Sequence, residues 1–187
     1  AGRSGPVRLL VVGGSLGAQA LNETVPQALA RLPVDQRPLV RHQAGERTLE
    51  LARNAYRDAG VEAEVVAFVR DMAEAYAWAD LVVCRSGALT VSELAAAGVG
   101  SILVPYPFAV DDHQVGNARY LSDAGAARLI IQRDLTAVGL ADILSELFAD
   151  RARLLAMAEA ARRRAQPEAT DHIARVCLEL SVRGTPS

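Results

Sequence analysis

Short apolar runs alternate with segments of helical periodicity along most of this chain. The apolar runs predict strands at 8–12, 39–43, 64–67, 81–84, 102–105 and 128–131. Between them, apolar residues recur three and four positions apart, which predicts helices at 18–31, 46–59, 71–78, 88–97 and 114–124. Strands that alternate with helices form βαβ units, and such units build a parallel sheet covered on both faces. We therefore predict an α/β fold with a Rossmann-like parallel sheet.

The C-terminal part of the chain differs, because helical segments follow one another there without a further strand. Helices are predicted at 137–149, 150–165 and 168–181. In the last of these, an apolar stripe at helical spacing comprises Ile173, Val176, Cys177 and Leu180. The stripe could pack on its own domain or dock on a partner domain that this chain lacks. We divide the chain into a linker or terminal segment at 1–6, a domain at 7–166 and a tail helix at 167–187.

Composition fits a globular domain and disfavours several functional classes. The chain has 187 residues, of which 51% are hydrophobic and 22% charged, as in soluble folded proteins. The formal net charge is −2 and no basic stripe is interleaved with aromatics, so nucleic-acid binding is not expected. No apolar run reaches the roughly 18 residues of a membrane-spanning helix, so any membrane contact should be peripheral or lie outside this chain. Cys84 and Cys177 lie among apolar residues and are predicted to be ordinary buried thiols.

The clearest candidate for ligand binding is the helix start that follows the fourth predicted strand. The apolar run 81–84 ends at Arg85-Ser86-Gly87, and the helix begins at Ala88. Backbone N–H groups at such a start can bind an anion. Glu93 follows one turn later on the same face, where its carboxylate could hold a ribose diol. A diphosphate beside a ribose suggests a sugar nucleotide.

A glycine-rich loop, 13–18, follows the first predicted strand and opens a helix. Gly13, Gly14 and Gly17 permit close approach of the backbone to a phosphate, and Ser15 could add a hydroxyl. The alternative is a plain tight turn. The GxGxxG pattern is not met, and the second strand ends in 41–44 without the acidic residue that a nicotinamide site requires, so NAD binding is disfavoured. His42, in that strand, is interpreted as a polar residue near a strand end.

Two further loops lie where ligands bind in open parallel sheets, beyond the carboxyl ends of the strands. Phe68 and Val69 follow the third strand and could hold a flat base, although Phe68 taken alone is expected to be a core residue. His113, Gln114 and Asn117 follow the fifth strand and could bind sugar hydroxyls as donors and acceptors. The run 111–113, Asp-Asp-His, makes a poor metal site because adjacent ligands diverge, and helix capping is its alternative role. We expect neither a metal nor a cofactor.

Four segments together resemble the donor-binding, C-terminal half of the MurG family of bacterial glycosyltransferases. They are 13–18, 71–80, 84–93 and 113–118, and they follow the family's order and spacing within about residues 7–148. The resemblance implies a GT-B enzyme with two facing Rossmann-like domains, of which this chain is the second, followed by extra C-terminal helices. It implies an inverting transferase that moves N-acetylglucosamine (GlcNAc) from UDP-GlcNAc to the 4-hydroxyl of N-acetylmuramic acid in lipid I. The product, lipid II, serves peptidoglycan synthesis.

The resemblance also implies roles for individual residues. Phe68 and Val69 would border the uracil, Val69 through its backbone, and Glu93 would hold the ribose hydroxyls. Gln114, with His113, would contact the sugar, although position 113 is often glutamine in this family. Ser15 and the helix start would bind the diphosphate. The full implied donor site comprises Ser15, Phe68, Val69, Ala88, Leu89, Thr90, Val91, Ser92, Glu93, His113 and Gln114, with Gly13, Gly14 and Gly17 as the phosphate loop.

The family's catalytic base and lipid-binding surface belong to an N-terminal domain that this chain lacks. The resemblance therefore implies no catalytic residue here, and the fragment should bind donor without turnover. The tail helix would dock on that domain, and membrane contact, at the cytoplasmic face of the inner membrane, would occur only through it. Other hypotheses are a UDP-GlcNAc 2-epimerase, a non-catalytic nucleotide-sugar binding module and, more weakly, a nicotinamide oxidoreductase.

Overall fold

A single parallel sheet organises the computed structural model, which describes residues 3–14, 17–108 and 113–183. Its strands are β1 (Arg8–Val12), β2 (Leu39–Gln43), β3 (Glu64–Val66), β4 (Leu81–Cys84), β5 (Gly100–Leu103) and β6 (Ala127–Leu129). They lie in the order β3-β2-β1-β4-β5-β6, and every neighbouring pair is parallel. This confirms the predicted α/β class. Strands β2 and β3 are added on one side of β1, and β4, β5 and β6 are added on its other side. Open α/β sheets bind ligands at such a switch in strand order, here between β1 and β4.

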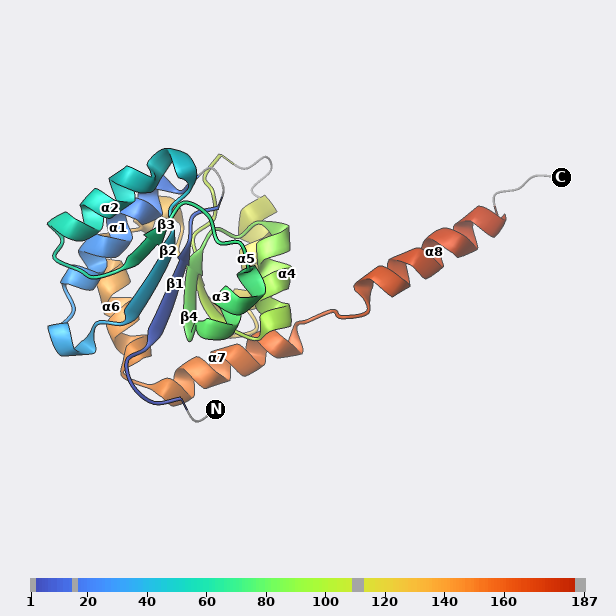
Figure 1. Cartoon of the computed structure of the whole chain (residues 1–187). Helices are drawn as coiled ribbons and strands as arrows, with labels where there is room; N and C mark the ends of the chain where they lie inside the picture. The colour runs from blue at the N-terminus through green and yellow to red at the C-terminus, as the bar shows by residue number, and fades with distance from the viewer. Residues whose placement is uncertain (1–2, 15–16, 109–112, 184–187) are drawn as a thin grey trace.

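Helices cover both faces of the sheet, as Figure 1 shows. They are α1 (Gln19–Ala30), α2 (Leu49–Asp58), α3 (Met72–Trp78), α4 (Ala88–Ala97), α5 (His113–Ser122), α6 (Ala137–Phe148), α7 (Arg151–Arg163) and α8 (Ala169–Arg183). One face carries α1, α2 and α6, and the other carries α3, α4 and α5. Helix α7 packs against α4 and β5.

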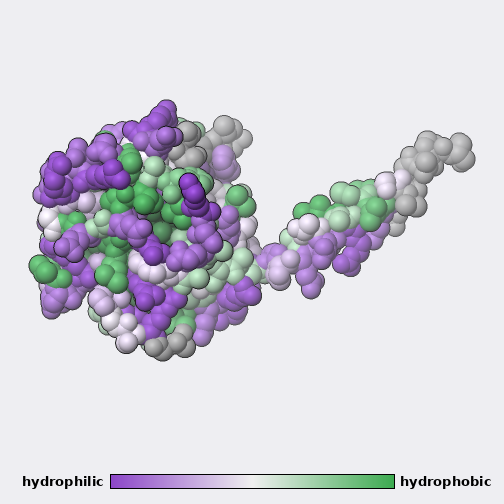
Figure 2. All heavy atoms as spheres, viewed as in Figure 1, coloured by the Kyte–Doolittle hydropathy of each residue, from purple (hydrophilic) through white to green (hydrophobic). Residues whose placement is uncertain are grey.

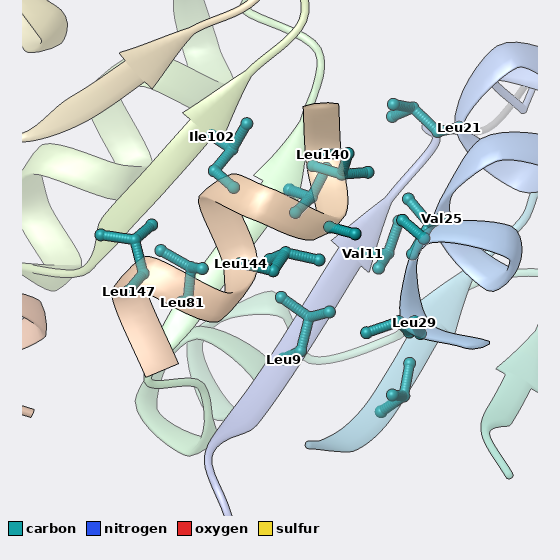
Figure 3. Close-up of a cluster of buried hydrophobic side chains, with 14 of the residues drawn as sticks. Leu9, Val11, Leu21, Val25, Leu29, Leu81, Ile102, Leu140, Leu144 and Leu147 are labelled. Carbon is teal, nitrogen blue, oxygen red and sulfur yellow. The ribbon is translucent and has the colours of Figure 1, made fainter. Parts of the chain in front are cut away.

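The core consists of two apolar clusters, one on each face of the sheet. Alternate residues of β1 separate between them: Leu9 and Val11 join one cluster, and Leu10 and Val12 join the other. Figure 3 shows the first cluster, in which side chains of β1 meet those of α1 and α6. Because central strands of a parallel sheet are buried on both faces, they are continuously apolar, and this is why the short runs were recognisable in the sequence.

Strand β5 begins at Gly100, two residues before the predicted run 102–105. Helix α7 packs closely on the start of this strand: a Cβ on Gly100 would lie 2.9 Å from the Cβ of Met157 on α7. Glycine therefore lets α7 approach the start of the strand. Because glycine has no apolar side chain, the hydrophobic pattern did not mark this position as part of a strand. The predicted last strand, 128–131, is likewise displaced and occupies Ala127–Leu129.

Helix α8 extends away from the domain, and its apolar residues gather along one side (Figures 1 and 2). Ile173, Val176 and Leu180 are exposed, so packing of the stripe on its own domain is not what the structure shows. The buried-thiol prediction is correct for Cys84 and wrong for Cys177, which is exposed on this helix. Neither α8 nor any other helix of the described residues is long and apolar enough to cross a membrane.

Candidate functional site

The predicted ligand loops meet at one edge of the sheet, because all strands run in the same direction. Val12, the last residue of β1, pairs with Cys84, and Cys84 pairs with Leu103, so the loops after β1, β4 and β5 start at the same level. On the other side Val12 pairs with Gln43, and Gln43 pairs with Val66. The loop that follows β3, with Phe68 and Val69, begins at this same edge.

Gly13 and Gly17, in the glycine loop after β1, pack directly on β2 and the segment that follows it. The Gly13 N–H donates to the Gln43 carbonyl over 2.9 Å, and the Gly17 N–H donates to the Gly14 carbonyl over 3.0 Å. Gly17 has φ +77°, and a Cβ there would lie 2.5 Å from the Ala44 carbonyl oxygen. A Cβ on Gly13 would likewise lie 3.0 Å from the Gln43 carbonyl oxygen, so backbone packing favours glycine at both positions. Ser15 lies outside the described residues, so its phosphate role stays a prediction.

A buried hydrogen-bond chain supports this loop from beneath. The Asn22 side chain donates to the Ala44 carbonyl over 3.1 Å, and its Oδ1 lies 2.9 Å from His42 Nε2. His42 Nδ1 lies 3.0 Å from the Tyr56 hydroxyl. Burial lowers the pKa of His42 to about 3 and raises that of Tyr56, so a neutral imidazole donates to Asn22 and accepts from Tyr56. His42 was predicted only as a polar strand residue; its partners lie on other elements and gave no sequence signal.

Lowering the pH from about 7.5 to about 5.5 is expected to reduce the free energy of unfolding by about 1.4 kcal/mol through this histidine. The pKa of His42 is 6.5 ordinarily and about 3 in the folded chain. Between these values the unfolded chain binds a proton that the folded chain excludes. The stabilisation is complete above the ordinary pKa and is lost progressively as the pH falls toward 3. Urea unfolding at the two pH values measures the difference.

The matched control is His172→Gln, which removes an exposed histidine from α8 and should leave this pH dependence unchanged. His42→Gln should unfold at lower urea at both pH values and should lose the difference between them. An unchanged unfolding midpoint in the original chain at the lower pH would contradict the neutral buried imidazole.

The start of α4 is an open cluster of backbone donors, as the sequence predicted. Helices α3, α6 and α7 each begin at a residue whose side chain accepts a hydrogen bond from a first-turn N–H. Helix α4 begins at Gly87, which has no side chain to do so. The first-turn N–H groups of a helix have no partner within it, and the helix dipole makes this end positive. The first-turn N–H groups of Ala88, Leu89 and Thr90 therefore have no capping side chain at Gly87 to donate to, and their role as an anion site stays a prediction.

The other predicted site residues on α4 differ in exposure: some side chains lie in the core and others lie at the surface. Leu89 is 73% exposed beside the helix start, whereas the Val91 side chain is buried in the core. The Val91 N–H donates to the Gly87 carbonyl over 3.0 Å, so neither the side chain nor the N–H of Val91 is left for a ligand. The Ser92 hydroxyl donates to the Ala88 carbonyl over 3.0 Å, which ties it to the helix itself. Glu93 is half-buried, and its Oε2 accepts a 3.0 Å hydrogen bond from the Tyr76 hydroxyl of α3.

Arg85 connects the loop after β4 with the chain just after β5 and with the segment that contains Gln132. The sequence marked this residue only as the end of a strand. Its Nη1 donates to the carbonyls of Val104 and Pro105 over 3.1 and 3.2 Å, and its Nη2 donates to Gln132 over 2.6 Å. The guanidinium carbon lies 5.7 Å from the centre of the Tyr106 ring. Partial burial lowers the pKa of Arg85 below its usual value, and the guanidinium stays cationic at neutral pH. Arg85 thus fixes the chain where it leaves β5.

The loop after β5 orients the predicted sugar-binding residue. The Tyr106 N–H donates to Gln114 Oε1 over 3.0 Å, which turns the Nε2 group of that amide the other way. The Ser86 hydroxyl donates to the Gln114 carbonyl over 2.8 Å, and the Asn117 side chain donates to the Ser86 carbonyl over 3.1 Å. Asn117 therefore connects two loops, and the Gln114 amide is held by the Tyr106 N–H.

Exposed aromatic residues flank this edge. Phe68 is 62% exposed, so its interpretation as a core residue is wrong, while Val69 packs partly against the core. Tyr106 and Phe108 form an exposed edge-to-face pair with ring centres 5.6 Å apart, which the sequence did not predict. His113 is exposed as the first residue of α5. Asp111 and Asp112, the other members of the weak metal alternative, lie outside the described residues.

Comparison with known proteins gives the family. Residues 8–176 match the glycosyltransferase family 28 C-terminal domain. Among curated relatives, the UDP-N-acetylglucosamine--N-acetylmuramyl-(pentapeptide) pyrophosphoryl-undecaprenol N-acetylglucosamine transferase of Marinobacter nauticus is 60% identical over 179 residues, 96% of this chain and 49% of the relative. The transferase of the same name from an Azoarcus species is 60% identical over 97% of this chain and 50% of the relative. The chain thus spans about half the length of these relatives.

Solved structures agree with this assignment. The crystal structure of Acinetobacter baumannii MurG superposes with a TM-score of 0.87 at 45% identity, over 94% of this chain and 52% of that one. A UDP-GlcNAc 2-epimerase from Neisseria meningitidis superposes with a TM-score of 0.62 at 9% identity, over 95% of this chain and 45% of that one, which shows the fold alone. The chain therefore belongs to the glycosyltransferase family 28 C-terminal domain family, and its six-stranded sheet is a GT-B C-terminal domain of the MurG type.

Proposed function

We propose that this chain is the donor-binding half of an inverting transferase that moves GlcNAc from UDP-GlcNAc to the 4-hydroxyl of N-acetylmuramic acid in lipid I, giving lipid II. The names of its relatives support the reaction class. One observation carries the assignment to this chain: α4 starts without a capping side chain directly after β4, and Glu93 follows on the same helix one turn after Thr90. In a nucleoside diphosphate, the diphosphate and the ribose diol are likewise close together, because both are attached to the same sugar.

The donor is proposed to bind along this edge from base to sugar. The uracil lies beside Phe68 and the backbone of Val69, and the ribose hydroxyls donate to Glu93. The diphosphate accepts from the α4 start and from the glycine loop, with Ser15 and Thr90 adding hydroxyls. The sugar hydroxyls contact Gln114 and His113. Exposure of Phe68 and the fixed orientation of the Gln114 amide support the two ends of this arrangement.

The chemistry follows from where charge develops. The acceptor hydroxyl attacks the anomeric carbon from the face opposite UDP, so the configuration inverts and negative charge grows on the departing diphosphate. The N-terminal dipole and N–H groups of α4 stabilise that charge more in the transition state than in the bound donor. A general base must remove the acceptor proton, and we place it in the other half of the transferase, the part of the relatives that these 187 residues do not span. The chain alone should bind donor without turnover.

We place the whole enzyme at the cytoplasmic face of the inner membrane as a peripheral protein whose membrane contact is made by its other domain. The tail helix α8 is proposed to dock on that domain. Its exposed apolar side chains, Ile173, Val176 and Leu180, support this role because an apolar stripe left in water is otherwise costly.

Reconstitution tests the proposal. We expect no transfer from UDP-GlcNAc to lipid I by this chain alone, and transfer when it is combined with the N-terminal half of a MurG relative. Release of free epimerised sugar by the combined halves would favour the 2-epimerase alternative. Donor binding with no reaction in any combination would favour a non-catalytic binding module.

Gln114→Ala is expected to weaken UDP-GlcNAc binding by about 0.5–1.5 kcal/mol, about 2- to 12-fold, and to leave UDP binding unchanged. The reason is that its oriented amide faces the sugar and does not contact the nucleotide. Calorimetric titration with both ligands measures the two affinities. Asn117→Ala is the matched control: it removes an amide of the same helix that supports a loop, so any loss should be shared by both ligands. Equal losses in Gln114→Ala would mean that Gln114 does not read the sugar.

A further inference from the structure

The segment 71–80, which the resemblance singled out, has no role in the donor site described so far. It contains α3, and its one close polar contact with that site is made by Tyr76. The Tyr76 ring belongs to the core cluster and is 4% exposed, yet its hydroxyl emerges beside α4 and lies 3.0 Å from Glu93 Oε2. A buried side chain therefore reaches the carboxylate proposed to hold the ribose.

The direction of this hydrogen bond is fixed by chemistry. Burial raises the pKa of Tyr76, and the nearby acidic groups of Cys84 and Glu93 raise it further, so the phenol keeps its proton. An ionised carboxylate only accepts hydrogen bonds. Tyr76 therefore donates to Oε2, which occupies one position on that oxygen and restricts the rotation of the carboxylate.

Both ends of the segment are anchored, so the hydroxyl is held in place. In the first turn of α3, the Glu74 carboxylate accepts from Arg41 Nη1 of β2 over 3.0 Å. Just beyond its end, the Asp80 carboxylate accepts from the Arg8 N–H of β1 over 3.0 Å and pairs with Arg3 at 2.9 Å. The carboxylate of Glu93 itself sits on α4, whose start binds the proposed diphosphate. Tyr76 thus links the carboxylate proposed to hold the ribose to a segment that is itself hydrogen-bonded to the sheet.

We propose that Tyr76 is a positioning residue for the donor: it orients the Glu93 carboxylate toward the ribose diol and so contributes to the preference for a ribonucleotide. This inference rests on the proposed function. In this role Tyr76 acts through the Glu93 carboxylate, which accepts the hydrogen bond from its hydroxyl. Its effect must therefore appear only with ligands that carry the diol.

Calorimetric titration of the full 187-residue chain with UDP and with 2′,3′-dideoxy-UDP tests this prediction. Tyr76→Phe should weaken UDP binding by about 2- to 12-fold, the range for one hydrogen bond, and leave dideoxy-UDP binding unchanged. Tyr120→Phe is the matched control, because it removes a tyrosine hydroxyl that donates to the Arg164 carbonyl outside the donor site. It should change neither affinity. Thermal unfolding of each variant verifies that it is folded.

A loss shared equally by both nucleotides, or no loss with either, would overturn the positioning role. Glu93→Gln separates this failure from failure of the proposed function. If Glu93→Gln abolishes the preference for UDP over dideoxy-UDP while Tyr76→Phe retains it, only the role of Tyr76 fails. If Glu93→Gln also retains the preference, or the unchanged chain binds no UDP, the proposed donor site fails with it. When both variants lower the preference, adding Tyr76→Phe to Glu93→Gln should cause no further loss.

Discussion

Replacing Glu93 with alanine is expected to weaken binding of UDP and of UDP-GlcNAc alike by about 1.5–3 kcal/mol, about 10- to 150-fold. Both ligands carry the ribose, so both should lose the hydrogen bonds to its carboxylate. Hydrogen bonds to a charged acceptor are worth more than neutral ones, and Glu93 is half-buried with its carboxylate already oriented by Tyr76. Calorimetric titration of the variant with each ligand measures the loss.

Glu62→Ala provides the matched control, because it removes one exposed carboxylate from the turn before β3. It should leave both affinities unchanged, which would show that the loss in Glu93→Ala is not a general effect of net charge. Unchanged affinity in Glu93→Ala would show that Glu93 does not bind the ribose. The assignment of the donor site, which depends on that contact, would then fail as well.

Gly17→Ala is expected to lower the free energy of unfolding by at least about 2 kcal/mol and to abolish detectable UDP binding. A non-glycine residue at φ +77° costs about 1–2 kcal/mol by itself. The added methyl would also lie 2.1 Å from the Thr48 hydroxyl and 2.5 Å from the Ala44 carbonyl oxygen. Because the second of these atoms belongs to the backbone, the glycine loop must move away from the sheet edge. Urea unfolding and UDP titration measure the two effects.

Gly60→Ala isolates the contribution of backbone strain in this comparison. Gly60 has φ +62°, and a Cβ there would meet nothing within 4 Å. Its variant should lose only the left-handed conformational term, about 1–2 kcal/mol, and should bind UDP normally. Equal losses of stability in the two variants would mean that the glycine loop is not held by contact with the segment after β2.

Local signals were sufficient to predict the architecture and the clearest part of the site. The run Leu81–Cys84 is fully buried, and Gly87 follows it directly before α4, so both the strand and the start of α4 could be located from the sequence. Helical spacing then placed Glu93 one turn from that start. The parallel direction of the strands, itself inferred from their alternation with helices, brought the predicted loops to one edge.

Contacts between distant segments were not predictable in the same way. Arg85 bonds to residues 19, 20 and 47 positions away, and His42 bonds to residues on α1 and α2 that any periodicity would assign to ordinary helix faces. Tyr76 and Glu93 are 17 positions apart and lie on different helices. Side-chain partners of this kind depend on how elements pack, which residue type and spacing do not specify.

The two wrong burial predictions have a related cause. Phe68 and Cys177 are residue types that are most often enclosed, so composition favoured burial. Their exposure depends on what covers their part of the chain. Phe68 lies in a loop at the ligand edge, and Cys177 lies on a helix that extends from the domain. Periodicity shows that α8 has an apolar face, and it does not show which surface covers that face.

Calorimetric titration of this chain with UDP-GlcNAc, UDP and NADH, first without and then with magnesium, tests the central claim most directly. The account predicts binding of both uridine ligands, indifference to magnesium and no binding of NADH. Absence of uridine binding, both alone and after addition of the N-terminal half of a MurG relative, would contradict the account, as would binding of NADH in preference to UDP.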